Sequence, residues 1–278
     1  MTVQNTSHIF PFLRWTGSKR WFIKHHISRF LPNKFNNFHE PFLGGGSVFF
    51  FIKQTFQEEK RKFFLADTNE DLINVYEQLR DNPHGVIENL KQFKNTKEDY
   101  YKVRSYNPRN NERKAAKFIY LNRTSFNGIY RVNPNGVYNV PYGYRSNVDF
   151  VTENLLLDVS ELLQDTVFST TSFHKSLASV KKGDLVFLDP PYTVAHENNG
   201  FIEYNQKLFS WDDQEKLKKM VEKIISKNAF FILTNASHKS IKTLYTDIAK
   251  ITVLSRPSIV GGRTKTRSTY NELIVHNF

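Results

Sequence analysis

The sequence predicts an α/β fold, in which a sheet of buried strands is covered by helices and one mainly helical segment is inserted. Short continuous apolar runs are typical of strands buried on both faces of a sheet. They occur at Phe63–Ala66, Leu185–Leu188 and Phe230–Leu233, and Glu272–His276 predicts a last strand. Ser210 and Asp213 are spaced as in a helix-capping box, so a helix begins there. Strands interleaved with helices indicate the α/β class.

The segment from residue 70 to residue 165 differs in character from the rest of the chain. It lacks strong strand runs and contains helical stretches such as Glu112–Leu121. The turn signal Asn133–Gly136, with Ile129–Val132 before it and Val137–Val140 after it, predicts a β-hairpin. We therefore predict one domain from residues 1–69 plus 166–278, and an inserted domain at 70–165.

Composition restricts the class of protein. Among the 278 residues, 39% are hydrophobic and 24% charged, as in ordinary globular proteins, and the net charge of +12 favours a polyanionic partner. The chain has no cysteine, which excludes disulfides and cysteine-ligated zinc. The nine histidines show no metal-ligand spacing, so no metal site is predicted. The start lacks a secretory signal pattern and no run reaches membrane-spanning length, so we expect a soluble, cytoplasmic protein.

The tetrapeptide Asp189-Pro190-Pro191-Tyr192 directly follows a predicted strand and has the parts needed to methylate an exocyclic amine of a nucleobase. The Asp189 carboxylate and the Pro190 carbonyl can accept the two N–H bonds of such an amine and aim its lone pair. Pro190 and Pro191 fix φ and remove two backbone donors. Tyr192 offers an aromatic face for stacking on the base. The alternative is a strand that ends in a tight Asp-Pro turn without a chemical role.

A glycine-rich loop at Glu40–Ser47 forms a second candidate site. Gly44, Gly45 and Gly46 allow backbone to approach a ligand closely, and the apolar run after them can open a helix. Asp67 follows the strand-like run Phe63–Ala66 and stands 21 positions after Gly46, near the spacing that places a carboxylate on ribose hydroxyls. The loop is not a complete dinucleotide fingerprint, and no Walker A lysine follows it. An adenosine-containing ligand without a pyrophosphate fits this pattern, and S-adenosylmethionine is such a ligand.

Near the start of the chain, Trp15 and Lys19 are four positions apart around Gly17. They could contact the aliphatic and carboxylate parts of a methionine moiety. The alternative is a generic basic loop.

Together these segments resemble the DNA adenine-N6 methyltransferases of the Dam and DpnII methylase group. The resemblance lies in Phe12–Arg20, Glu40–Ser47, Leu65–Leu72, Tyr120–Tyr144 and Asp189–Tyr192, in the family's order. It implies a Rossmann-like, S-adenosylmethionine-dependent methyltransferase sheet with an inserted target-recognition domain. The cofactor residues that it implies are Trp15, Lys19, Glu40, Phe42, Gly44, Gly46, Ser47, Asp67, Phe173 and Asp189. Relatives often have Asp where this chain has Ser172, which leaves the contacts to the adenine ring open.

The resemblance also implies a partner, double-stranded DNA, and roles for residues of the hairpin segment. Arg131 would bond a guanine, Ile129 and Pro141 would make apolar contacts to bases, and Arg14 would contact an outer base pair. Phe126 would be a wedge beside a flipped base, and Asn127 a partner for the orphaned base or the backbone. These roles imply GATC as the target, although related enzymes with other targets share much of the segment. Arg123 and Arg131 could instead bind phosphate, which positions DNA without specifying its sequence.

Two alternatives to adenine-N6 methylation of DNA remain open at this point. A cytosine-N4 or RNA base methyltransferase could use the same tetrapeptide, and the chain could be a catalytically silent DNA-binding module. Methylation at C5 of cytosine is excluded, since it needs a thiolate nucleophile. We expect a monomer, and the sequence leaves open whether a restriction endonuclease acts as a separate partner. Loops at Thr193–Gln206 and Gly261–Arg267 are expected to close over the flipped base and to contact phosphates, respectively.

Overall fold

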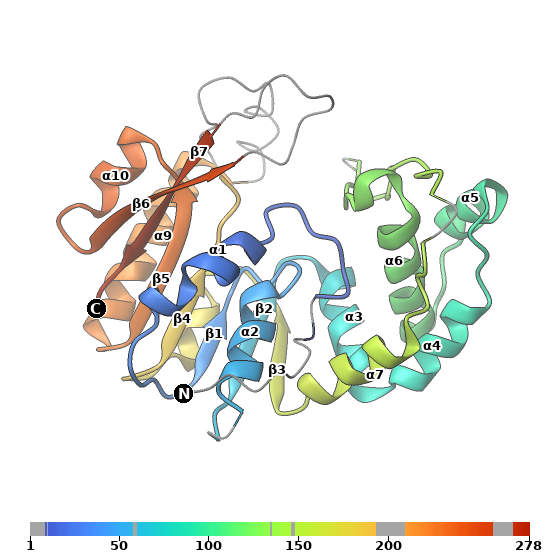
Figure 1. Cartoon of the computed structure of the whole chain (residues 1–278), viewed down its shortest axis with the longest axis horizontal. Helices are drawn as coiled ribbons and strands as arrows, with labels where there is room; N and C mark the ends of the chain where they lie inside the picture. Colours follow the sequence, from blue (N-terminus) through green and yellow to red (C-terminus); the bar gives the residue numbers. More distant parts are fainter. Residues whose placement is uncertain are drawn as a thin grey trace. The chain divides into compact units, whose positions relative to one another are not determined.

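The computed structural model describes residues 9, 11–57, 60–133, 135–145, 148–192, 209–257 and 269–278 (Figure 1). The two loops expected at Thr193–Gln206 and Gly261–Arg267 lie outside these residues. Among the described residues, no helix is both long enough and apolar enough to span a membrane.

Seven strands form one sheet in the order β3-β2-β1-β4-β5-β7-β6. Their bounds are Phe38–Glu40 for β1, Phe63–Asp67 for β2, Thr166–Thr170 for β3, Leu185–Leu188 for β4, Phe230–Ala236 for β5, Lys250–Pro257 for β6 and Thr269–His276 for β7. Strand β1 is parallel to β2 and β4, and β4 is parallel to β5, whereas β7 runs antiparallel to both β5 and β6. All four strands predicted from the sequence, β2, β4, β5 and β7, are confirmed; β1, β3 and β6 were not among the predictions.

The contacts within the chain group the residues into two units, which we call the sheet unit and the helical unit. The sheet unit comprises Lys24–Phe42, Arg61–Thr68 and Thr171–Phe278. The helical unit comprises Met1–Ile23, Leu43–Lys60 and Asn69–Thr170, and so includes strand β3. The glycine-rich loop Glu40–Ser47 therefore belongs to the sheet unit up to Phe42 and to the helical unit from Leu43 onward.

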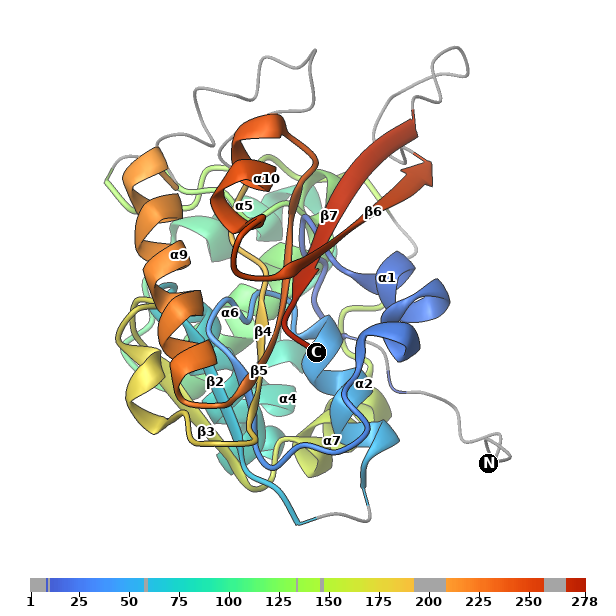
Figure 2. The ribbon, with the colours of Figure 1, turned by 90° about the vertical axis from the view of Figure 1, so that its left-hand side faces the viewer.

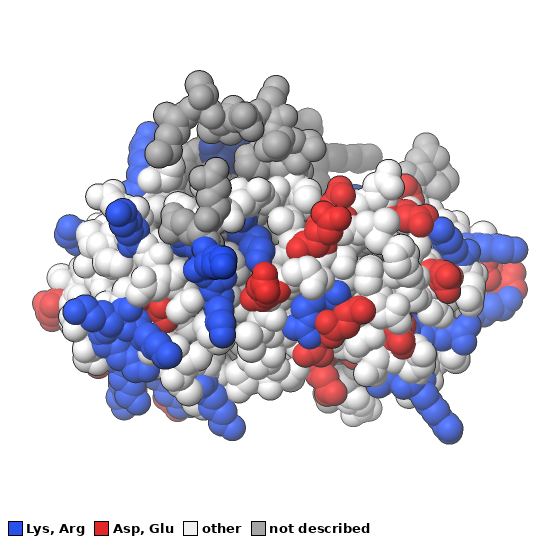
Figure 3. Space-filling model, turned by 90° about the horizontal axis from the view of Figure 1, so that it is seen from below, with Lys and Arg blue, Asp and Glu red and all other residues white. Residues whose placement is uncertain are grey.

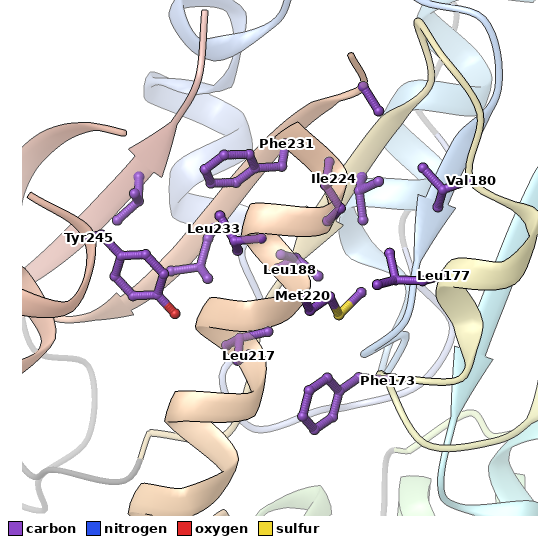
Figure 4. Close-up of a cluster of buried hydrophobic side chains, with 14 of the residues drawn as sticks. Phe173, Leu177, Val180, Leu188, Leu217, Met220, Ile224, Phe231, Leu233 and Tyr245 are labelled. Atoms are coloured by element: carbon purple, nitrogen blue, oxygen red, sulfur yellow. The ribbon is translucent and has the colours of Figure 1, made fainter. Parts of the chain in front are cut away.

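Within the sheet unit, helices α9 (Trp211–Ser226) and α10 (Lys239–Tyr245) cover one face of β4, β5 and β7 (Figure 2). Apolar side chains from these elements form a continuous core (Figure 4). Leu188 and Leu233 contribute from the strands, and Leu217 and Ile224 from α9; each is completely buried. Burying a side chain of this size contributes about 1.5–3 kcal/mol, so this core is what holds the helices on the sheet.

Helix α9 begins at the capping box predicted from the sequence. The Ser210 hydroxyl accepts from the Asp213 amide at 3.2 Å, and the Asp213 carboxylate accepts from the Ser210 amide at 3.0 Å. The box satisfies two backbone donors at the helix start.

A buried side-chain hydrogen bond joins β1 to the start of β4 inside the sheet unit. The Asp184 carboxylate lies 2.9 Å from His39 Nε2 and accepts from the amides of Asn37 and Lys181 at 3.0 and 2.8 Å. Burial opposes the charge of Asp184, but the hydrogen bonds from His39 and from these two amides outweigh it and lower the pKa of the carboxyl.

The helical unit is built around α6 (Asn111–Thr124), the predicted helix of the inserted segment. It packs against α3 (Glu70–Asp81), α4 (Pro83–Lys91) and α5 (Lys97–Ser105). Asn or Thr side chains cap the amide ends of all four helices.

The remaining described helical elements of the two units are α1 (Arg20–His25), α2 (Ser47–Thr55), α7 (Glu153–Leu162) and the 3-10 turns η1 (Ile27–Phe30), η2 (Phe126–Gly128) and η3 (Ser176–Ser179). Helix α2 follows the glycines, as predicted.

The predicted hairpin forms, but with less strand pairing than a two-stranded ribbon. Its antiparallel pairing is a single bridge between Val132 and Tyr138, supported by bonds from Asn133 N to Val137 O and from Asn139 N to Arg131 O. The Tyr138 hydroxyl also donates to the Ile129 carbonyl at 3.0 Å. One bridge and a few hydrogen bonds, rather than an extended ladder, therefore join the two arms.

Candidate active site

The carboxyl ends of four parallel strands of the sheet unit lie at one edge of the sheet, and a polar side chain stands at each. Glu40 ends β1, Asp67 ends β2 and Asp189 follows β4, while Thr234 lies near the end of β5. The chain passes from β1 to β2 on one side and from β4 to β5 on the other, so the strand order reverses between β1 and β4. Ligands of open α/β sheets bind at such a switch point.

The tetrapeptide Asp189–Tyr192 occupies this edge directly after β4. Asp189 and Tyr192 are partly buried, Pro190 is buried and Pro191 is exposed. The run Leu185–Leu188 is fully buried, so a rigid strand carries the motif to the edge. The arrangement presents a carboxylate and an aromatic ring from one short segment, as the predicted chemistry requires.

Two residues from the neighbouring strands bind the side chains of this motif. The Thr234 hydroxyl donates to Asp189 Oδ1 at 2.6 Å, and the Tyr192 hydroxyl donates to Glu272 Oε2 at 3.0 Å. Thr234 is completely buried and Glu272 is 1% exposed. Sequence reasoning missed both residues. No local pattern marks them, but once β4 and β5 are paired, Thr234 is the next residue after the partner of Leu188.

Three phenylalanines form an aromatic group within the sheet unit. Phe42 stacks on Phe173 with ring centroids 5.2 Å apart, and Phe209 packs at 5.9 Å from Phe42 and 5.6 Å from Phe173. The sequence identified Phe42 and Phe173 but missed Phe209. Its position before the Ser210 cap, where an apolar residue often packs, was the available signal.

Asp67 and Ser172 lie at the end of β2 and after β3. The carbonyl of Asp67 accepts from the amide of Thr171 at 3.0 Å, while Ser172 Oγ lies 3.2 Å from His174 Nε2 at an exposed position. Asp67 is partly buried. A carboxylate can accept hydrogen bonds from ribose hydroxyls, and aromatic rings can stack on a purine. The residues of the sheet unit therefore fit the adenosine part of S-adenosylmethionine.

In the helical unit, Trp15 lies on the glycine loop. An added Cβ would lie 2.6 Å from Trp15 Nε1 at Gly44 and 2.8 Å from Trp15 Cβ at Gly45. The structure thus places the side chain of Trp15, itself a predicted cofactor residue, against Gly44 and Gly45, and the assignment of the loop to a ligand stays a prediction. Gly44 and Gly46 also have φ of +47° and +66°, respectively, and the backbone of any residue with a Cβ would be strained at these angles.

The other predicted cofactor residues are buried. Lys19 is 4% exposed, and its ammonium donates to the Gly17 carbonyl at 2.9 Å. Ser47 Oγ lies 2.8 Å from Ser18 Oγ, which joins the start of α2 to the N-terminal segment. Glu40 is 3% exposed. Within the helical unit, local hydrogen bonds therefore hold Lys19 and Ser47 in place.

The residues with predicted DNA contacts are mostly exposed on the segment after α6. Phe126 is 53% and Ile129 is 37% exposed, and Asn127 and Pro141 are exposed as well. Arg131 is exposed, and its Nε donates to Asn139 Oδ1 at 2.7 Å. Exposed apolar side chains of this size, beside an arginine, are typical of an interaction surface.

Arg14 is placed by a buried asparagine that the sequence interpretation missed. Asn122, 1% exposed, accepts from the Arg14 amide at 2.8 Å and donates to the Arg14 carbonyl at 2.8 Å. The Arg14 side chain lies on Gly128, where an added Cβ would be 2.4 Å from its Cδ. Asn122 could have been recognised from the sequence, because it lies within Tyr120–Tyr144, a segment that resembles the family.

Arg123, unlike the exposed Arg131, is partly buried, and backbone carbonyls bind its guanidinium. It donates to the carbonyls of Phe12 and Asp149 at 3.4 and 3.0 Å. Burial, and then the nearby charge of Arg14, lower its pKa. Its observed contacts are therefore structural.

The described residues contain no group of three or more His, Asp or Glu side chains that could hold a metal ion. On the face shown in Figure 3, Lys and Arg gather over the left-hand part, whereas both signs of charge are interspersed over the right-hand part.

Comparison with known proteins identifies the family. Residues 15–257 match the model described as D12 class N6 adenine-specific DNA methyltransferase. The Type II methyltransferase M1.LlaDCHI of Lactococcus lactis subsp. cremoris is 35% identical over 285 residues, covering 99% of this chain and 98% of that protein. A DNA adenine methylase of Haemophilus influenzae is 32% identical over 244 residues, covering 84% and 82%. Among solved structures, the rRNA methyltransferase aviRa of Streptomyces viridochromogenes has a TM-score of 0.38 at 11% identity, covering 92% and 81%.

The chain therefore belongs to the D12 class of N6 adenine-specific DNA methyltransferases. The resemblance stated from the sequence is confirmed, and so is the α/β class with its Rossmann-like methyltransferase sheet.

Proposed function

We propose that this methyltransferase transfers a methyl group from S-adenosylmethionine to N6 of an adenine that is flipped out of duplex DNA, within the sequence GATC. Family membership supports the adenine and the DNA. The observation that carries the mechanism is the position of Asp189–Tyr192 at the switch point of the sheet, with both side chains oriented by hydrogen bonds.

The residues of the motif act on the amine. S-adenosylmethionine, when bound, would supply a sulfonium methyl group: the amine attacks the methyl carbon while the C–S bond breaks, and the sulfur leaves as a neutral thioether. The Asp189 carboxylate and the Pro190 carbonyl accept hydrogen bonds from the two N6–H groups. The nitrogen lone pair then leaves conjugation with the ring and points toward the methyl group. Tyr192 stacks on the extruded base. The N6 proton is lost after the new C–N bond forms, so Asp189 acts as an acceptor that need not be a strong base beforehand.

The cofactor assignment divides between the two units. In the sheet unit, Asp67 would bind the ribose hydroxyls, Phe42 and Phe173 would pack against the adenine ring, and Glu40 and Asp189 lie at the same sheet edge. The helical-unit residues proposed for the cofactor are Trp15, Lys19, Gly44, Gly46 and Ser47. Burial and local hydrogen bonding of Lys19 and Ser47 support a preorganised loop.

Residues 70–165 would be the target-recognition domain. Arg131 would bond guanine in the major groove, and Phe126 would be the wedge beside the flipped base. Asn127, Ile129, Pro141 and Arg14 would contact neighbouring bases or backbone, with Arg123 supporting the segment from inside. Base extrusion costs a few kcal/mol. Apolar contacts from the exposed side chains and electrostatic attraction between DNA and a chain of net charge +12 would offset this cost.

One experiment tests donor, base and site together. The purified chain is incubated with unmethylated plasmid and S-adenosylmethionine, and modified bases are mapped by single-molecule sequencing. N6-methyladenine confined to GATC is expected. N6-methyladenine at another motif would refute the GATC assignment and leave the chemistry intact. No modified base would refute the proposed reaction.

A further inference from the structure

Asp189 and Tyr192 each bind a buried side chain from another strand of the sheet unit. The backbone of the motif offers few anchors of its own, since Pro190 and Pro191 have no N–H to donate. The two prolines therefore have no amide that could orient the side chains of Asp189 and Tyr192. The hydroxyl of Thr234 and the carboxylate of Glu272 do bond these side chains.

We propose that Thr234 and Glu272 are positioning residues for methyl transfer, Thr234 by orienting the Asp189 carboxylate and Glu272 by orienting the Tyr192 ring. This inference rests on the proposed roles of Asp189 and Tyr192 in holding the adenine.

The register of the sheet makes the first contact specific. Leu188 pairs with Leu233 in the parallel ladder of β4 and β5, so Asp189 and Thr234 are the next residues on the two strands. An ionised carboxylate can only accept, so the hydroxyl donates. The distance of 2.6 Å is in the range of charge-assisted O–H···O⁻ bonds. This bond restricts rotation of the carboxylate, and a hydrogen bond donated to the charged form of a carboxyl stabilises that form.

The second contact comes from β7, the other neighbour of β5 in the sheet. In the antiparallel ladder of β5 and β7, Thr234 pairs with Ile274 and Ala236 pairs with Glu272. Residues two apart on a strand share a face, and directly paired residues share it too, so Thr234 and Glu272 project from the same face of the sheet. Glu272 is 1% exposed, and its Oε2 accepts from the Tyr192 hydroxyl. A stacking platform whose far end is bonded to a buried carboxylate has a defined ring orientation.

The test for Thr234 compares Thr234→Val with Thr234→Ser. Valine has the shape of threonine without the hydroxyl, and serine keeps the hydroxyl. Tritiated S-adenosylmethionine and unmethylated plasmid DNA give kcat, both KM values and the pH profile. We expect Thr234→Val to lower kcat roughly tenfold or more. KM for S-adenosylmethionine should stay within about twofold, and the acid limb of the profile should move to higher pH.

Thr234→Ser should recover kcat to within about threefold of the native chain, since its hydroxyl can make the same bond. Thr166→Val is the matched control, because it removes another buried hydroxyl, bonded to the Leu163 carbonyl at 2.5 Å in the helical unit. It should change stability and leave the pH profile unmoved. Native kcat and an unmoved acid limb in Thr234→Val would overturn the role of Thr234. Equal losses in the Val and Ser variants would also overturn it, since they would indicate packing.

The test for Glu272 is a double-mutant cycle with Tyr192→Phe and Glu272→Leu. If Glu272 acts through the Tyr192 hydroxyl, the double variant loses no more activity than the worse single variant. Duplexes with 2-aminopurine at the target adenine report base stacking by fluorescence without any transfer, and both single variants should change that signal. Additive losses would overturn the role of Glu272. If Glu272→Leu does not fold, as judged by circular dichroism, native kcat and native 2-aminopurine fluorescence in Tyr192→Phe would overturn it.

Asp189→Ala separates this inference from the proposed function. Methyl transfer that survives in Asp189→Ala would refute the proposed site itself. Loss of transfer in Asp189→Ala with a native Thr234→Val variant would refute only the inference drawn here from Thr234.

Discussion

Replacing Gly44 by alanine should destabilise the helical unit through one identifiable clash. Gly44 has φ +47°, and an added Cβ would lie 2.6 Å from Trp15 Nε1 and 2.8 Å from Trp15 Cδ1. An L-residue in the left-handed region costs roughly 1–2 kcal/mol. Forcing the indole aside in a packed region adds about 1–3 kcal/mol. The free energy of unfolding should therefore fall by about 2–5 kcal/mol.

Gly17 offers a matched control within the same unit. It has φ +83°, but an added Cβ would meet nothing within 4 Å, so Gly17→Ala carries the backbone strain without the clash. Urea unfolding, followed by circular dichroism, should show a loss of only about 1–2 kcal/mol for that variant. The difference between the two variants measures the contact between Trp15 and the glycine loop.

A second background sharpens this measurement. In a Trp15→Ala chain the indole is absent, so adding Gly44→Ala should cost only the strain of the positive φ, about 1–2 kcal/mol. Equal destabilisation by Gly44→Ala and Gly17→Ala, or an undiminished cost of Gly44→Ala without the indole, would refute the reasoning.

Three further predictions follow from other contacts. Ser210→Ala should lower the free energy of unfolding by about 1 kcal/mol, because it removes the cap of α9; Ser226→Ala, at the other end of the helix, is the comparison. Asp184, whose pKa is lowered, should contribute stability above about pH 4, and this contribution should be lost as the pH falls through the lowered pKa. Urea unfolding between pH 2 and 7 should therefore show a shallower acid dependence for Asp184→Asn, and an unchanged slope would contradict it. Arg131→Ala should weaken binding to the preferred sequence by about 1–3 kcal/mol in competition assays and weaken random DNA less; a uniform loss would mean that Arg131 binds phosphate only.

Local patterns made much of the sheet and helix arrangement predictable. The buried strands and the capping box of α9 are specified by residues within a few positions of one another, so both were recognisable in the sequence. Short elements were less predictable: β1 has three residues, too few to show a period. The hairpin signal predicted the turn correctly, but not that the pairing would be limited to one bridge.

The chemical groups that the chain carries, and the local elements that carry them, can be inferred from short stretches of sequence. Asp189–Tyr192 follow a buried strand and Asp67 ends another, because apolar runs and turns depend on near neighbours. The distant groups that meet these residues can be identified only in the folded chain. Thr234 lies 45 positions from Asp189 and Glu272 lies 80 positions from Tyr192, and strand order and register bring each pair together. Trp15 likewise reaches Gly44 through packing. Such contacts depend on how the whole chain buries its apolar surface, which no short stretch of sequence encodes.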